Sequence, residues 1–219
     1  MATSNRELPA RLRELAVAPV RPLAPPRWRA LRLLPIGLAV VSAAPLLFGI
    51  RPDAERLGWL LTWGASAAQA TIGLWLIGLA FRESVPGRAL SPAAVLAATA
   101  LAAGCVALVS MLAFVASPLG VPAQARLTVD IACLSGTVLG AAPLVIAAGL
   151  LVARAFPLRP GLAGALYGLG AGILSDSGWR LFCHFTTASH VLVTHLGGVL
   201  LCGVLGALIA RTWSRASTR

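Results

Sequence analysis

Long uninterrupted apolar runs dominate the pattern of hydrophobic and polar positions along this chain. Four runs contain no charged residue, and they cover residues 33–50, 57–81, 93–115 and 131–153. A fifth run begins at Gly161 but meets Asp176 and Arg180 after 15 residues, and a sixth covers residues 190–210. Because about 20 apolar residues in a helix cross the hydrocarbon of a bilayer, these runs predict transmembrane helices.

The same pattern excludes the other membrane architecture. Backbone groups in lipid must be paired internally, which leaves helices or a closed barrel, and unbroken apolar runs lack the alternation of barrel strands. We therefore predict an all-α membrane protein in which a bundle of six transmembrane helices occupies residues 33–210. A cytoplasmic segment at 1–32 precedes the bundle, and a basic cytoplasmic tail at 211–219 follows it. Because roughly 30 polar and proline-rich residues precede the first run, we expect no cleaved signal peptide.

Composition and charge support this prediction and set its orientation. The chain is 58% hydrophobic and 11% charged, which is too apolar for a water-soluble domain of 219 residues. With the N-terminus inside, 14 of the 18 basic residues, all of them arginine, fall in inner segments. This asymmetry predicts an inner-membrane protein with both termini in the cytoplasm. The net charge of +11 then lies on the inner face, where it suits an anionic leaflet of the lipid bilayer without any direct nucleic-acid partner.

The segment before the bundle divides into two parts. Leu8, Leu12 and Leu15 recur at i, i+4 and i+7 with charged residues on the other faces, which predicts a short amphipathic helix. The proline-rich stretch 18–26 that follows cannot be helical. Because so short a helix is marginal in water, its leucines need a surface to fold on. That surface is either the inner leaflet or a groove on a protein partner, and both remain open.

The four cysteines separate by their depth in the predicted membrane. Cys105 and Cys202 lie near the middle of apolar runs, where a thiol acts as a small hydrophobic group. Cys133 and Cys183 lie at the outer boundary, where an oxidising compartment favours a disulfide and a soft metal ion is an alternative ligand for two thiolates. In either chemistry, His184 or His190 is a candidate for supporting the two thiols; two unpaired structural cysteines are the third possibility.

The remaining polar residues of the bundle give no catalytic pattern. His190 and His195 are five residues apart and no HExxH pair accompanies them, so they are a weak signal for catalytic zinc. Asp176 and Arg180 have the i, i+4 spacing of a helical ion pair, and we expect His195 to hydrogen-bond across helices. Gln69 is the main polar residue deep in the second run. We therefore expect neither an enzyme nor a cofactor, and keep a small-solute transporter and a membrane-embedded metal-dependent enzyme as alternatives.

Several short motifs add a family resemblance to this picture. With these motifs, six predicted spans and short loops, the chain resembles the NrsF family of negative regulators of sigma factor F. The motifs that carry the resemblance are the proline-rich Ala18–Leu23, Gly49–Asp53, Cys133-Leu134, Pro143, Ala155–Gly164 and the region Cys183–His195. The resemblance covers nearly the whole chain, although His184 stands where proline is expected and no aromatic residue precedes His195.

The resemblance implies a function as well as a fold. Members of the family are inner-membrane anti-sigma factors that hold an extracytoplasmic-function sigma factor inactive until a signal arrives. The resemblance also implies that two outer cysteines matter for the response to heavy metals such as chromate and cadmium. Cys133 and Cys183 match those positions, so we expect them to sense the signal and to be the metal ligands, if a metal binds. We expect Leu8, Leu12 and Leu15 to bind the sigma factor.

Overall fold

The computed structural model describes residues 31–155 and 157–216, and all regular secondary structure in these ranges is helical. This confirms the all-α class that the apolar runs predict. The predicted amphipathic helix with Leu8, Leu12 and Leu15 lies outside the described residues.

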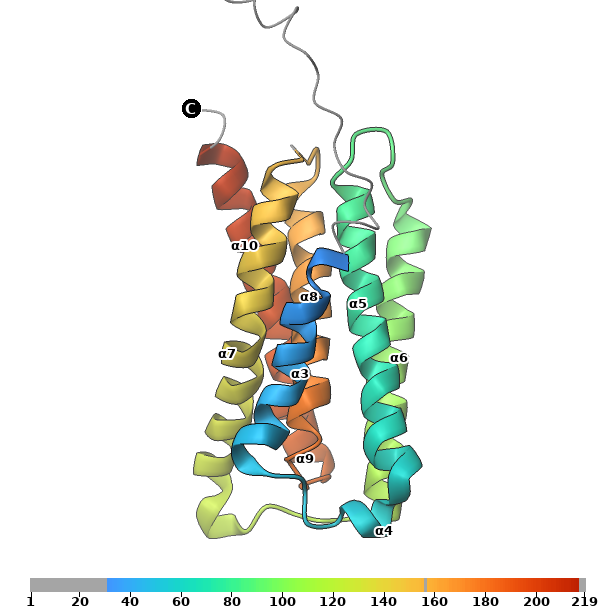
Figure 1. The fold of residues 1–219 in the computed structure, drawn as a ribbon, viewed down its shortest axis with the longest axis vertical. Helices are drawn as coiled ribbons and strands as arrows, with labels where there is room; N and C mark the ends of the chain where they lie inside the picture. Colours follow the sequence, from blue (N-terminus) through green and yellow to red (C-terminus); the bar gives the residue numbers. More distant parts are fainter. Residues whose placement is uncertain (1–30, 156, 217–219) are drawn as a thin grey trace, which may run out of the picture.

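Helical segments run side by side along the long axis of the bundle (Figure 1). Proline at the first positions of α6 and α8 suits a helix start, since the ring fixes a helical φ angle where no amide donor is needed. The elements are α3 (Leu34–Phe48), α4 (Ala54–Trp59), the π-helical turn η1 (Leu60–Gly64), α5 (Ala65–Glu83), α6 (Pro92–Ala116), the 3-10 turn η2 (Ala123–Ala125), α7 (Arg126–Ala153), α8 (Pro160–Trp179), α9 (Ala188–His190), the π-helical turn η3 (Val191–Leu196) and α10 (Gly197–Ala216).

Four continuous helical stretches in the described part of the chain are long and apolar enough to cross a membrane. They are Ala54–Glu83, Pro92–Ala116, Ala123–Ala153 and Ala188–Ser214. Helix α3 is apolar but has only 15 residues. Helix α8 has 20 residues, and its many glycines together with Ser175, Asp176 and Ser177 reduce its hydropathy. These two helices correspond to the first and fifth apolar runs.

Helix α8 lies at the centre of the bundle. It packs against α3, α5, α7 and α10, and every residue from 170 to 178 is buried. Close approach depends on glycine: a Cβ atom added to Gly73 of α5 would lie 2.7 Å from the carbonyl oxygen of Gly170 in α8. Small residues allow such backbone contact between helices. The polar part of α8 is therefore enclosed by protein on all sides.

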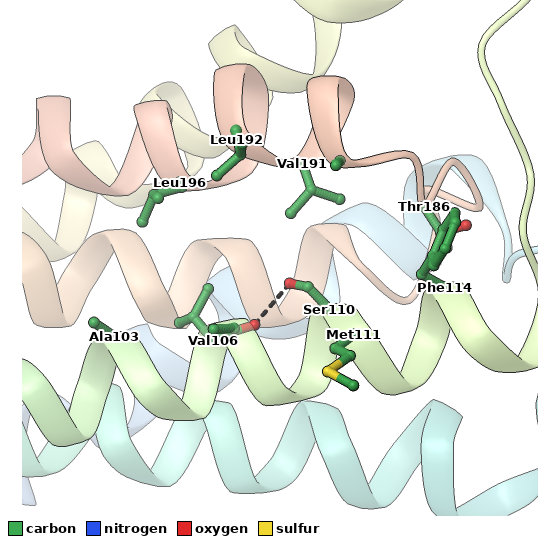
Figure 2. A pocket seen from close by; sticks show the side chains of 11 residues that line it. Ala103, Val106, Ser110, Met111, Phe114, Thr186, Val191, Leu192 and Leu196 are labelled. Atoms are coloured by element: carbon green, nitrogen blue, oxygen red, sulfur yellow. Dashed lines mark hydrogen bonds between the residues drawn. The ribbon is translucent and has the colours of Figure 1, made fainter.

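Helix α6 lies at the edge of the bundle beside α5 (Figure 1). Between α6 and the η3 region is an apolar groove of about 480 Å³ (Figure 2). Its two hydroxyl groups already donate within the protein, from Ser110 to the Val106 carbonyl at 2.6 Å and from Thr186 to the Ser117 carbonyl at 2.7 Å. The described residues that line this groove include no titratable side chain.

A buried carboxylate forms an ion pair at the end of the bundle opposite α9. Glu83, at the last residue of α5, accepts two hydrogen bonds from the Arg159 guanidinium, with Nε–Oε1 at 2.6 Å and Nη2–Oε2 at 2.8 Å. It also accepts the backbone N–H of Leu90 at 2.7 Å, and the Glu83 side chain is only 1% exposed. The ion pair therefore joins the end of α5 to the start of α8, and the bond from Leu90 adds the α5–α6 loop.

Candidate functional site

Two thiols and an imidazole come together at the α9 end of the bundle. Cys133 lies in the first half of α7, Cys183 lies in the loop after α8, and His190 is the last residue of α9. The two Sγ atoms are 3.7 Å apart, and the Cys183 Sγ is 3.4 Å from the His190 Nε2. All three side chains are buried, and their donor atoms lie within 4.8 Å of one another. We call this group the Cys2His cluster.

Asp130 fixes the orientation of the histidine in this cluster. Its Oδ1 atom lies 2.7 Å from the His190 Nδ1 atom. An ionised carboxylate only accepts hydrogen bonds, so Nδ1 must carry the proton and donate it. In neutral histidine the Nε2 atom that faces Cys183 is then a lone-pair donor, as in carboxylate–histidine–metal arrangements. Asp130 precedes Cys133 by three residues on α7, which places both on one face of that helix.

The other predicted supporting histidine is not part of the cluster. The His184 ring contacts the Phe185 ring, with centroids 4.2 Å apart and planes tilted by 38°, and its nitrogens do not belong to the group of close donor atoms. Burial lowers the pKa of His184, so it is neutral at physiological pH. The structure thus places His190, and not His184, beside the two thiols.

The cysteines differ in their surroundings as well as in their position. Contact with the Cys133 sulfur, together with burial, raises the pKa of the Cys183 thiol, which therefore keeps its proton at neutral pH. Cys105 lies on α6 and Cys202 on α10, and neither belongs to the cluster. None of the four is in a disulfide in this structure.

A second polar group, the Asp176 network, adjoins the Cys2His cluster. Asp176 of α8 is completely buried; its Oδ2 atom is 2.8 Å from the Arg180 Nε and its Oδ1 atom is 2.6 Å from the His195 Nδ1. Gln69 of α5 donates a further hydrogen bond to the same carboxylate. These contacts confirm the predicted ion pair and the predicted interhelical bond of His195. The His190 and His195 rings meet edge to face at 5.3 Å, which connects the two groups.

The sequence of this chain matches the model of a known protein family. A family model described as negative regulator of sigma F, NrsF, matches residues 15–215. The chain belongs to the NrsF family. A search of curated proteins found no match to it, and neither did a search of solved structures. NrsF membership makes the protein a negative regulator whose partner is a sigma factor, and it indicates a regulator in place of an enzyme.

One short motif of this NrsF chain, Gly49–Asp53, holds the loop that carries Cys183. The backbone N–H of Arg51 donates to the Leu181 carbonyl at 2.8 Å, and its guanidinium reaches the His184 carbonyl at 3.4 Å. Two bonds of 2.6 and 2.8 Å to Asp53 fix the guanidinium in place. The motif therefore positions the thiol loop from the α3 side.

The connection between α6 and α7 holds the same loop from the other side. Thr186 donates its backbone N–H to the Leu119 carbonyl at 2.9 Å, and its hydroxyl oxygen accepts the Leu119 N–H at 3.0 Å. Cys183 is thus held between two anchored positions, at Leu181 and at Thr186. Sequence reasoning missed both anchors and also Asp130, since nothing local in the chain indicates contacts between segments 60 or more residues apart.

Replacing Asp176 by asparagine is expected to destabilise the bundle. The change removes the counter-ion of Arg180, whose side chain is only 11% exposed. Breaking a buried ion pair on one side costs about 3 to 5 kcal/mol. Thermal unfolding of the purified protein in detergent measures this, and the matched control is Glu55→Gln, since Glu55 is exposed. Equal midpoints for the two variants would contradict a stabilising role for the Asp176 network.

Proposed function

We propose that this NrsF protein is a membrane-bound anti-sigma factor that sequesters an extracytoplasmic-function sigma factor and releases it on a periplasmic heavy-metal or oxidant signal. The family match over residues 15–215 is the observation that carries the regulatory role. The contact between Cys133 and Cys183, 50 residues apart in sequence, supports the sensing role.

The proposal includes six membrane spans with both termini in the cytoplasm. Four helical stretches are long and apolar enough alone. We add α3 and α8, because the polar residues of α8 contact protein and so avoid the cost of facing lipid. The domains are then the cytoplasmic segment 1–32, the bundle 33–210 and the tail 211–219, in the inner membrane of a bacterial cell. The arginine asymmetry along the sequence supports this orientation, which makes the α9 end periplasmic.

Reporter fusions after Arg219 test the topology. Alkaline phosphatase folds only outside the cytoplasm, so we expect that fusion to be inactive and a fluorescent-protein fusion at the same residue to be bright. A control fusion in the α6–α7 connection should give the opposite pattern. Active phosphatase after Arg219 would mean an odd number of spans, and would reject the proposed topology.

The sigma factor is held at the inner face, partly by Leu8, Leu12 and Leu15. Their spacing places them on one side of a helix, which suits a groove on a folded partner. The inner loops, residues 84–91 and 154–159 of the sequence, are too short to form a domain of their own. The N-terminal segment therefore offers the largest partner surface, and the bilayer is the competing surface for its leucines.

Replacing Leu12 by aspartate is expected to release the sigma factor without a signal. Burying one leucine is worth about 1.5 to 3 kcal/mol, and a buried carboxylate adds a further cost. Co-purification of the sigma factor from solubilised membranes and expression of its target genes measure the release. Arg11→Asp, beside Leu12 on a predicted polar face, is the matched control. Unchanged co-purification for Leu12→Asp would favour adsorption of the helix to the bilayer.

Cys133 and Cys183 sense the signal, and these two thiols can respond by either of two reactions. An oxidant can accept two electrons from the two thiols, which lose two protons as the Sγ–Sγ bond forms. Alternatively, a soft cation can join the two sulfurs as thiolates. Either reaction draws the loop after α8 against α7, and the inner loop 154–159 joins these same two helices. A change in their packing thereby alters the surface that holds the sigma factor.

Serine at Cys133 or Cys183 is expected to abolish induction by metal or oxidant while the sigma factor stays bound. Serine at Cys105 or Cys202 is expected to leave induction intact, because neither thiol belongs to the cluster. Reporter expression with and without the stimulus, together with co-purification in its absence, measures both effects. Loss of the response in the Cys105 or Cys202 variants, with retention in the other two, would overturn the assignment.

A further inference from the structure

We propose that Cys133, Cys183 and His190 form a mononuclear binding site for one borderline or soft divalent cation of the Zn²⁺ and Cd²⁺ class, with Asp130 as the group that orients the histidine. The proposal deepens the sensing role proposed above, since it assigns a third ligand, a supporting residue and a charge to the ligand of that site.

The spacing of the donor atoms is the first argument. With a metal–sulfur bond of about 2.3 Å and a metal–nitrogen bond of about 2.0 to 2.1 Å, a tetrahedral shell places two sulfurs about 3.8 Å apart and a sulfur and a nitrogen about 3.6 Å apart. The structure has 3.7 Å between the Cys133 and Cys183 sulfurs and 3.4 Å between the Cys183 sulfur and the His190 Nε2. These two distances fit a metal ion of this size, and all three donor atoms lie within 4.8 Å of one another.

Charge balance in a buried site is the second argument. The side chains of Cys133, Cys183 and His190 are 5% exposed or less. When a divalent cation binds, both thiols lose their protons to solvent, and two thiolates with one neutral imidazole neutralise the 2+ charge. A monovalent ion would leave the ligands with one uncompensated negative charge next to the Asp130 carboxylate, which is unfavourable in a site with little water. Thiolate and imidazole are also the ligands that suit zinc-like ions.

Preorganisation is the third argument. Asp130 holds the His190 ring through Nδ1, at 2.7 Å, so that Nε2 faces the sulfurs. Arg51 and Thr186 hold the chain on both sides of Cys183, through the Leu181 and Leu119 carbonyls at 2.8 and 2.9 Å. Binding therefore orders few additional groups, which raises affinity. Three protein ligands leave one position of a four-coordinate ion for a further donor.

Cadmium titration of the full-length protein tests the proposal directly. The parent protein carries Cys105→Ser and Cys202→Ser, so that only the cluster thiols remain, and it is kept reduced in detergent with a non-thiol reductant. Thiolate-to-cadmium charge-transfer absorption reports sulfur ligation, and equilibrium dialysis counts the bound ions. We expect one Cd²⁺ per chain, with the charge-transfer band lost when Cys133 or Cys183 is also replaced by serine.

Variants of the two neighbouring histidines separate the third ligand from a bystander. Asp130→Asn removes the group that orients the histidine and is expected to weaken Cd²⁺ binding by about 10- to 100-fold. His190→Ala removes the ligand itself and is expected to weaken binding by at least as much. His184→Ala is the matched control and should bind as the parent does. Circular dichroism checks the fold of each variant, and if His190→Ala fails to fold, the folded Asp130→Asn variant decides.

Three results would overturn the site. The first is a parent protein that binds no stoichiometric Cd²⁺, in which case the sulfur and nitrogen contacts are thiol hydrogen bonds only. The second is parental affinity in folded His190→Ala or, where that variant does not fold, in Asp130→Asn. The third is a loss of affinity in His184→Ala instead. Binding is measured without a sigma factor, so any of these results rejects the metal site and leaves anti-sigma activity and thiol oxidation to the reporter assays above.

Discussion

The burial of one carboxylate constrains much of this structure. Asp176 has no exposed surface, and an ionised carboxylate so deep in a bundle is costly unless donors surround it. Those donors come from three segments: Gln69 from α5, Arg180 from the end of α8 and His195 from η3. Arg180 reaches Asp176 from the next turn of the same helix, whereas Gln69 and His195 reach it only when their helices have the correct height and rotation. Neutralising this charge therefore fixes the register of α5, α8 and the last helical stretch.

Glycine residues allow α8 to lie at the centre of the bundle, in close contact with its neighbouring helices. A Cβ on Gly170 would contact the Gly73 carbonyl, and a Cβ on Gly164 or Gly206 would clash with the other's carbonyl across α8 and α10. Contacts this close give extensive van der Waals packing where lipid offers no hydrophobic driving force between helices. They also explain why the fifth apolar run, which meets Asp176 after 15 residues, is the shortest of the six in the sequence. A helix covered by its neighbours has no need for the hydropathy of a lipid-facing one.

The sequence predicted the features that depend on local spacing or on hydropathy. The apolar runs predicted the helices, and the i, i+4 spacing of Asp176 and Arg180 predicted their ion pair. The positions of Cys133 and Cys183 relative to the apolar runs predicted that both lie at the outer end of the bundle. Only the structure shows that the two thiols are in contact. The bonds from Asp130 to His190 and from Gln69 to Asp176 link residues 60 and 107 positions apart, and no local pattern encodes such pairs. For the same reason the sequence could not choose between His184 and His190.

The two ends of α8 are held by different chemistry. At its start, Arg159 pairs with Glu83, an interaction between groups that neither oxidants nor soft cations alter at neutral pH. Beyond its other end, Cys183 meets Cys133 and His190, which are the side chains that such agents attack or bind. Because neighbouring helices pack closely against α8 along its length, a displacement at the thiol end cannot be absorbed by loose side chains. We propose that movement of packed helices takes it up instead, which would give a chemical event at one end a mechanical route toward the other.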